Sequence, residues 1–241
     1  MDAFLYTAVS GADYAQRALA VRANNLANAQ TSGFRADMAI AEHLQVNGYG
    51  YDSRHQAGVT GTVVDQSRGR LSETGRPLDV AVQGDGYFSV QAEDGVAYSR
   101  AGHFVVDEEG ALTLDGRAVL GEGGPIVLPP YEALDVGADG SISIMPLGGT
   151  EMQVADRLAL VRPEPADLVK RPDGLLGSRT GIGYGLDPDV RVAAGHLEGS
   201  NVSAIEEMMQ TMQLSRTFEM QMRMFRNADE MAETGNRLIR G

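Results

Sequence analysis

The two ends of the chain are free of proline, and this constrains the fold more than any other feature of the sequence. All nine prolines lie between Pro77 and Pro188. Proline interrupts helices because it lacks a backbone N–H and its ring clashes with the preceding turn. Long helices are therefore expected at both ends, and a different architecture is expected in the middle.

The first 34 residues have the period of an amphipathic helix. Asp2 suits the N-cap position, and Gly33 before Phe34 predicts a left-handed stop. Only Arg22 interrupts the apolar face. That face, whose members are spaced by three or four residues, consists of Leu5, Ala8, Ala12, Ala15, Leu19 and Leu26.

A second long helix is predicted from Asn201 to Arg240, where Ser203 and Glu206 have the spacing of a capping box. Seven of the eleven methionines lie in this segment. Methionine adapts to irregular and non-identical partners. One apolar face consists of Ile205, Met208, Met209 and Met212, and the opposite face consists of Leu214, Phe218, Met222 and Phe225. A helix with two apolar faces needs more than one neighbour.

Residues 35–76 are predicted to form an extended connector with a first strand at residues 60–64. The apolar residues between Met38 and Leu44 favour a brief helix, and the glycine- and tyrosine-rich stretch at residues 48–51 favours a loop. The connector is therefore expected to lack a regular fold of its own before its strand.

Residues 77–199 carry short apolar runs between turns, several of them marked by Asp-Gly, as at Asp115 and Asp139. Asp-Gly favours hairpin turns because both central residues of a type I′ turn need positive φ. The fold class is therefore α+β. Helices at residues 1–34 and 200–241 are expected to pair as a coiled coil, and residues 77–199 are expected to form an antiparallel all-β domain, a sandwich or a distorted barrel.

The composition disfavours several functional classes. A net charge of -13 argues against nucleic-acid binding, which needs clustered Lys and Arg to neutralise phosphates. With no cysteine, the chain has no disulfide and no Cys-ligated metal site. We predict no catalytic, cofactor-binding or metal-binding residues. No apolar run approaches the ~20 residues that span a bilayer, and no basic secretory-signal start precedes Arg17.

The terminal helices need partners beyond each other. Ordering each residue costs ~1–2 kcal/mol in backbone entropy, and burying a large apolar side chain returns roughly 1.5–3 kcal/mol. A seam between only two helices leaves one face of the C-terminal helix unused. We therefore expect these helices to pack against copies or relatives of the same pair.

Several motifs also match a known family. The first motif is Asn24-Asn25-Leu26-Ala27-Asn28, followed by Gly33 and Phe34. The second comprises residues 74–88, which include Gly84 and Gly86, and continues at residues 98–104. The third is Gly199-Ser200-Asn201-Val202. The sequence thereby resembles the bacterial flagellar axial proteins, the rod and hook family. Within that family, residues 6–8, residues 216–221 and the lack of a large central insertion are most similar to proximal rod members.

The resemblance implies a non-enzymatic structural subunit of the proximal rod, the periplasmic drive shaft that transmits torque. Its implied partners are other copies of itself, neighbouring proximal and distal rod proteins, and the flagellar type III export apparatus, which needs no cleaved signal. The terminal helices would form an inner coiled-coil tube. The alternatives are a distal rod subunit and, from another class, a glycan-binding or cell-wall-acting β domain with oligomerising helices.

Overall fold

The computed structural model describes residues 2–45 and 55–240, with side chains described for residues 7–42, 57–58 and 61–238. The chain divides into two compact units, and each is described by itself. Unit 1 comprises Met1–Ala29, Ala36–Asp65 and Val202–Gly241, and unit 2 comprises Gln30–Arg35 and Gln66–Asn201.

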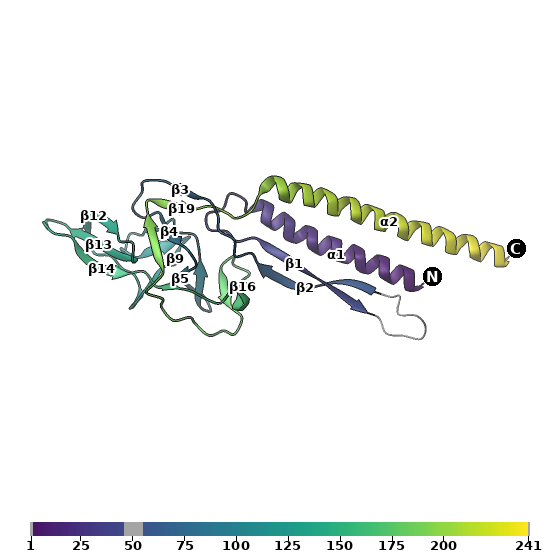
Figure 1. Ribbon diagram of the computed structural model, residues 1–241, viewed down its shortest axis with the longest axis horizontal. Coiled ribbons are helices and arrows are strands. Elements are labelled where there is room, and N and C mark those ends of the chain that lie inside the picture. The colour runs from purple at the N-terminus through teal and green to yellow at the C-terminus, as the bar shows by residue number, and fades with distance from the viewer. Residues whose placement is uncertain (1, 46–54, 241) are drawn as a thin grey trace. The chain divides into compact units, whose positions relative to one another are not determined.

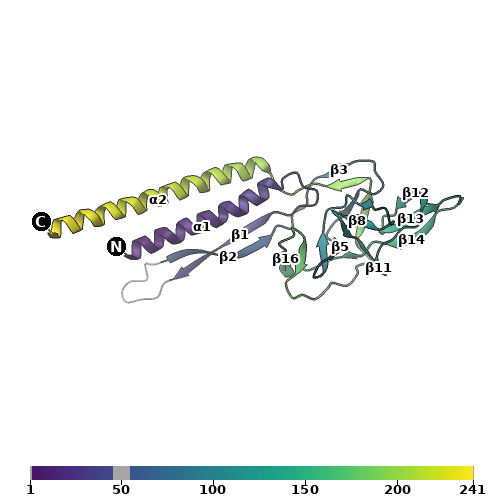
Figure 2. The same cartoon turned by 180° about the vertical axis from the view of Figure 1, so that it is seen from behind.

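Unit 1 contains two helices and a β-hairpin. Helix α1 spans Asp2–Ala27 and helix α2 spans Ala204–Arg240. Strands β1 (Asp37–Gln45) and β2 (His55–Val64) pair antiparallel with one register shift. Helix α1 lies between α2 and the hairpin in both views and contacts both (Figures 1 and 2).

Unit 2 is made of short strands and one 3-10 helix, η1 (Pro165–Asp167). In chain order the strands are β3 (Leu71–Glu73), β4 (Val80–Gln83), β5 (Tyr87–Ala92), β6 (Gly95–Ser99), β7 (Val105–Val106), β8 (Leu112–Leu114), β9 (Arg117–Ala118), β10 (Leu120–Gly121), β11 (Gly124–Pro125), β12 (Tyr131–Val136), β13 (Ser141–Pro146), β14 (Gln153–Arg157), β15 (Leu160–Val161), β16 (Leu168–Lys170), β17 (Leu176–Ser178), β18 (Arg191–Ala194) and β19 (His196–Glu198).

The strands of unit 2 pair antiparallel around one apolar core. The largest sheet has the order β15-β5-β6-β17-β16, and β12-β13-β14 and β7-β8-β9 form three-stranded sheets. Phe88 and Phe104 belong to this core, and their rings pack edge to face with centroids 5.1 Å apart. Strand β18 pairs with β4, and β19 pairs with β3. The last two strands before α2 are thereby joined to the first two strands of the unit.

The predicted α+β class is confirmed in its main part, with one helix near each end of the chain and antiparallel strands between them. The distorted-barrel alternative is wrong. Within the described residues the strands form separate sheets of two to five strands, and none of these sheets closes. In the largest sheet the two edge strands, β15 and β16, are not paired with each other, so this sheet stays open.

The region after α1 differs from the prediction. The helix ends at Ala27 rather than continuing to Gly33, although Gly33 has the predicted left-handed conformation with φ 68°. The brief helix predicted between Met38 and Leu44 is instead part of β1, because these residues pair with β2. The strand predicted at residues 60–64 forms one half of β2. The predicted loop at residues 48–51 lies outside the described part of the chain.

Of the described Asp-Gly turns, the one at Asp115 has the predicted type I′ conformation, whereas at Asp139 only the following glycine has positive φ. Asp115 and Gly116 have φ 49° and 78°, so both central residues of this turn adopt the left-handed conformation that a type I′ hairpin needs. At the turn between β12 and β13, Asp139 Oδ1 accepts hydrogen bonds from Ser141 N and Oγ at 3.1 and 2.6 Å. The Asp139 carboxylate thus fixes a hairpin turn.

Candidate functional site: the helix pair and two buried junctions

Helices α1 and α2 run antiparallel and pack along one seam. A Cβ added to Gly11 would lie 2.6 Å from Gln221 Nε2. Further along α1, Arg22 Nη1 donates to Glu207 Oε1 at 2.9 Å, and Glu207 precedes Gln221 by fourteen residues on α2. On α1 the seam begins with the small residues Gly11, Ala15 and Ala18 and continues with Arg22 and Asn25. On α2 it is partly polar, and its buried or half-buried members are Ala204, Glu207, Thr211, Leu214, Phe218, Gln221 and Ala228.

The predicted apolar face of α1 lies on or beside this seam. Ala15 is buried, Ala8, Ala12, Leu19 and Leu26 are half-buried, and the side chain of Leu5 lies outside the described set. Two buried residues of the seam, Ala18 and Asn25, lie outside the predicted apolar face, although Asn25 belongs to the recognised asparagine motif. Ala18 and Asn25 follow Gly11 by seven and fourteen residues, and this seven-residue spacing was the available signal.

The residues predicted to form the two faces of α2 differ in exposure. Leu214 and Phe218 are half-buried, and Met222 and Phe225 are 37% and 38% exposed. Met208, predicted on the opposite face, is 51% exposed. That opposite side carries an apolar stripe with side chains 53–81% exposed, which we call the outer ridge; it consists of Ile205, Met209, Met212, Met220, Met224, Met231 and Leu238.

Asn25 joins three elements of unit 1. Its side chain is fully buried. The Nδ2 atom donates to Asp37 O at 2.9 Å and to Glu207 Oε1 at 3.3 Å, and Oδ1 accepts from Asp37 N at 2.9 Å. The exposed Asn24 accepts through its carbonyl from Asn28 Nδ2 at 2.9 Å, where α1 ends. The asparagine motif therefore closes the helix and ties it to β1 and α2.

A second junction lies in unit 2, where one carboxylate binds two arginines. Glu198 Oε1 accepts from Arg35 Nη2 at 2.7 Å, and Oε2 accepts from Arg100 Nη1 at 3.1 Å. The three side chains are only 1–3% exposed. Arg100 also donates to Val82 O and to Gly84 O. Burial lowers the pKa of Arg100, and the nearby Glu198 carboxylate opposes that shift.

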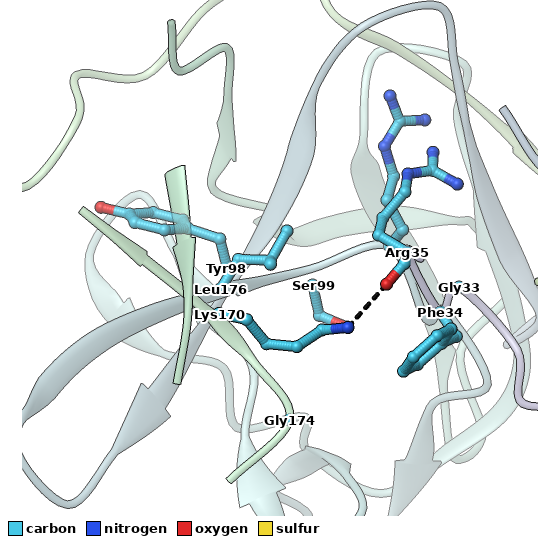
Figure 3. Close-up of a pocket in the computed structure, with 9 residues that line it drawn as sticks. Gly33, Phe34, Arg35, Tyr98, Ser99, Lys170, Gly174 and Leu176 are labelled. Carbon is cyan, nitrogen blue, oxygen red and sulfur yellow. Dashed lines mark hydrogen bonds between the residues drawn. The ribbon is translucent and has the colours of Figure 1, made fainter. Parts of the chain in front are cut away.

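The turn before Arg35 is held tightly against the β strands. A Cβ added to Gly33 would lie 2.0 Å from Ala101 N. Lys170 Nζ donates to Arg35 O at 2.6 Å and lies 3.8 Å from the centre of the Phe34 ring. Phe34, Arg35 and Lys170 line a small pocket together with Tyr98 and Leu176. Figure 3 shows Lys170 reaching toward the Arg35 carbonyl, while the Arg35 side chain extends away from the pocket.

The remaining motif residues serve the same close packing. A Cβ added to Gly86 would lie 2.7 Å from Val190 Cγ1. Gly199 N donates to Arg70 O at 2.9 Å. Asn201 Nδ2 donates to Ser67 O at 3.0 Å, and Asn201 N donates to Phe34 O at 3.3 Å. Ser200 and Val202, on either side of Asn201, are half-buried.

Three models of flagellar protein families match the chain. They are "Flagella basal body rod protein" at residues 5–35, "Flagellar hook protein FlgE/F/G D1 domain" at residues 81–144 and "Flagellar basal body rod FlgEFG protein C-terminal" at residues 193–238. Each match contributes one residue to the second junction. Arg35 comes from the first, Arg100 from the second and Glu198 from the third.

Full-length relatives show the same likeness. The chain is 38% identical to flagellar basal-body rod protein FlgF of Salmonella typhimurium over 99% of both chains, and equally similar to that of Escherichia coli. The chain belongs to the flagellar basal-body rod protein family. Flagellar basal-body rod protein FlgG of Bacillus subtilis is 31% identical over 95% of this chain and 96% of its own.

This rod protein is accordingly a structural subunit of the flagellar basal body. The assignment favours a structural role over the glycan-binding alternative. Among the described helices none is long and apolar enough to cross a membrane. The two buried junctions give the motif residues a structural role. Asn25 joins α1 to β1 and α2, and Glu198 binds Arg35 and Arg100.

Proposed function

We propose that this chain is a proximal rod subunit that polymerises through α1 and α2 and carries torque along the periplasmic drive shaft. The observation that carries the proposal is the outer ridge of α2, which leaves seven large apolar side chains exposed. Burying each would contribute roughly 1.5–3 kcal/mol. Contiguous exposed apolar surface of this kind marks protein–protein contact sites.

The proposed partners are other copies of the chain and neighbouring proximal and distal rod proteins. Packing of α1 and α2 as a coiled coil with helices of these neighbours suits the seven-residue spacing of the seam. Five of the seven outer-ridge residues are methionines, which adapt to non-identical surfaces. We also propose delivery by the flagellar type III export apparatus without a cleaved signal. Recovery of the intact N-terminal peptide from isolated basal bodies would test that route.

A distal rod role is the second candidate, since FlgG relatives also match most of the chain. The identity of 38% to the Salmonella typhimurium FlgF, against 31% to the Bacillus subtilis FlgG, favours the proximal position, which the family resemblance assigns to FlgF proteins. Cross-linking in isolated basal bodies distinguishes the two positions by the rod proteins that are captured.

The principal test places a charge on the outer ridge. Met212→Glu is compared with Ser215→Glu, a matched variant at an exposed polar position on the flank of the same helix. Cells carrying only Met212→Glu should lose the rod in isolated basal bodies and lose swimming motility. Ser215→Glu should retain both.

The soluble monomers of both variants should have the helical content of the wild type, because both positions are exposed. Normal rods in cells that carry Met212→Glu, and again in cells that carry Met220→Glu, would contradict assembly through this face.

A further inference from the structure

Helix α2 has two apolar stripes, and only one of them packs on α1. The outer ridge carries seven large apolar side chains that stay exposed. The seam carries Leu214 and Phe218, with Met222 and Phe225 at its margin. Arg216, Arg223 and Glu230 interrupt the ridge, and the arginine stems allow their charged ends to reach water beside a packed helix. Since hydrophobic stabilisation follows the apolar area buried, it does not favour the seam over the ridge.

The seam also buries polar atoms at a cost. Glu207 Oε2, Thr211 Oγ1 and Gln221 Oε1 are buried and have no hydrogen-bond partner among the described residues. Burying a polar atom without a partner lowers the stability of a fold. These atoms therefore oppose the observed orientation of α2, and another interaction must fix it.

Glu207 supplies that interaction. Its Oε1 atom accepts from Arg22 Nη1 at 2.9 Å and from Asn25 Nδ2 at 3.3 Å, and its side chain is only 8% exposed. The Asn25 side chain is held in place independently of α2, because it also bonds the backbone N–H and carbonyl of Asp37. Helix α1 thus presents two donors that require an acceptor on the facing stripe of α2.

We propose that Glu207 selects the face of α2 that packs on α1 and thereby keeps the outer ridge exposed. Turning the ridge inward would take the carboxylate away from both Arg22 and Asn25. Coiled coils use a buried polar residue in the same way, specifying one arrangement of helices at a cost in stability. The inference rests on the proposed function, since it explains how the ridge stays available for assembly instead of being buried within the subunit.

Single thiols report which face of α2 is exposed, and the chain is suited to them because it has no cysteine. Met220→Cys marks the ridge, where Met220 is 56% exposed, and Thr211→Cys marks the seam, where the Thr211 hydroxyl is buried. In the soluble full-length chain, a maleimide should react quickly with the ridge thiol and slowly with the seam thiol, because local opening must expose the latter.

The decisive variant combines Arg22→Leu with Glu207→Leu. The difference in rate between the two thiols should be lost, because both stripes of α2 then compete for α1. Replacing a buried ion pair by apolar side chains is often neutral or stabilising, so the melting temperature should not fall. Glu207→Gln alone keeps an oxygen acceptor for both donors, and it should preserve the difference.

A second variant moves the carboxylate to the other stripe. Glu207→Leu with Met209→Glu should make the seam thiol the faster of the two, since the ridge then carries the acceptor for Arg22. This variant retains an acidic partner for Arg22, so it provides the test even where the double-leucine variant does not fold. An unchanged order of the two rates in this variant would overturn the proposal, and so would a loss of the difference in Glu207→Gln.

Incorporation into basal bodies separates this inference from the proposed function. Cells carrying only the double-leucine variant should contain less of the subunit in isolated basal bodies, although the soluble chain is as stable as the wild type. Normal incorporation together with a lost thiol difference would support face selection by Glu207 and contradict assembly through the ridge. An unchanged thiol difference in the double-leucine variant would refute face selection, whatever the incorporation.

Discussion

Arg35 and Glu198 lie 163 positions apart in the sequence and form an ion pair of 2.7 Å with side chains 1% and 2% exposed. Arg100 binds the other oxygen of the same carboxylate at 3.1 Å. Removing one member of a buried ionic cluster is costly, because the remaining charges stay desolvated without a partner. Glu198 is the member on which both cations depend.

Glu198→Ala should therefore destabilise unit 2 by about 3–5 kcal/mol, the range for a broken buried ion pair. Urea unfolding of the full chain, followed by near-ultraviolet circular dichroism of the tyrosines, measures the loss. Asp85→Asn is the matched control because its pair with Arg68 is exposed at 58% and 76%, and it should cost less than about 1 kcal/mol. Equal losses in the two variants would show that burial of the cluster is unimportant.

Gly33→Ala should destabilise unit 2 far more than Gly75→Ala. Both glycines have similar positive φ, 68° and 71°, so backbone strain of roughly 1–2 kcal/mol is common to both substitutions. A Cβ at Gly33 also meets the backbone at Ala101, whereas a Cβ at Gly75 meets nothing within 4 Å. Thermal unfolding of the two variants separates strain from crowding, and similar melting temperatures would refute this account.

The sequence predicts the parts of this protein that local patterns determine. The absence of proline predicted both helices, and Asp115-Gly116 predicted a type I′ turn. Strand β1 was missed because the apolar residues from Met38 to Leu44 were interpreted as a brief helix, and the strand depends on pairing with β2. Buried Glu198 was missed because a lone glutamate has no local partner, and its arginines lie 98 and 163 positions away.

Asn25→Asp should loosen the junction between α1, β1 and α2. The change replaces the Nδ2 donor by a carboxylate oxygen that faces the Asp37 carbonyl and the Glu207 carboxylate. Asn24→Asp introduces the same charge at an exposed neighbouring position and should have little effect. Amide hydrogen exchange of α1 and β1 measures the difference, and equal protection in the two variants would contradict the role of Asn25.

The β12–β13 turn should weaken in acid through Asp139. Hydrogen bonds from Ser141 and the nearby Arg157 lower the pKa of Asp139 to about 2. A carboxyl group with a lowered folded-state pKa stabilises the fold above its unfolded value, and that contribution disappears as the pH falls through the folded value. The loss should therefore occur between about pH 4 and pH 2.

Asp139→Asn removes this titration and the ion pair with Arg157 at 2.6 Å. Amide exchange in β13 should depend less on pH in the variant than in the wild type over that interval. The same pH dependence in both proteins would assign the acid sensitivity to another carboxyl group.

Oxidation of the outer ridge should block assembly without unfolding the subunit. Hydrogen peroxide transfers one oxygen to a methionine sulfur and leaves water, which converts an apolar side chain into a polar sulfoxide. Met209, Met212 and Met220 are more than half exposed, so they should react readily while circular dichroism of the monomer stays unchanged. A variant with leucine at all five methionines of the ridge, Met209, Met212, Met220, Met224 and Met231, keeps an apolar ridge that resists oxidation. Peroxide should reduce wild-type self-association, measured by sedimentation, and spare the leucine variant; equal inhibition of both would place the sensitive contact elsewhere.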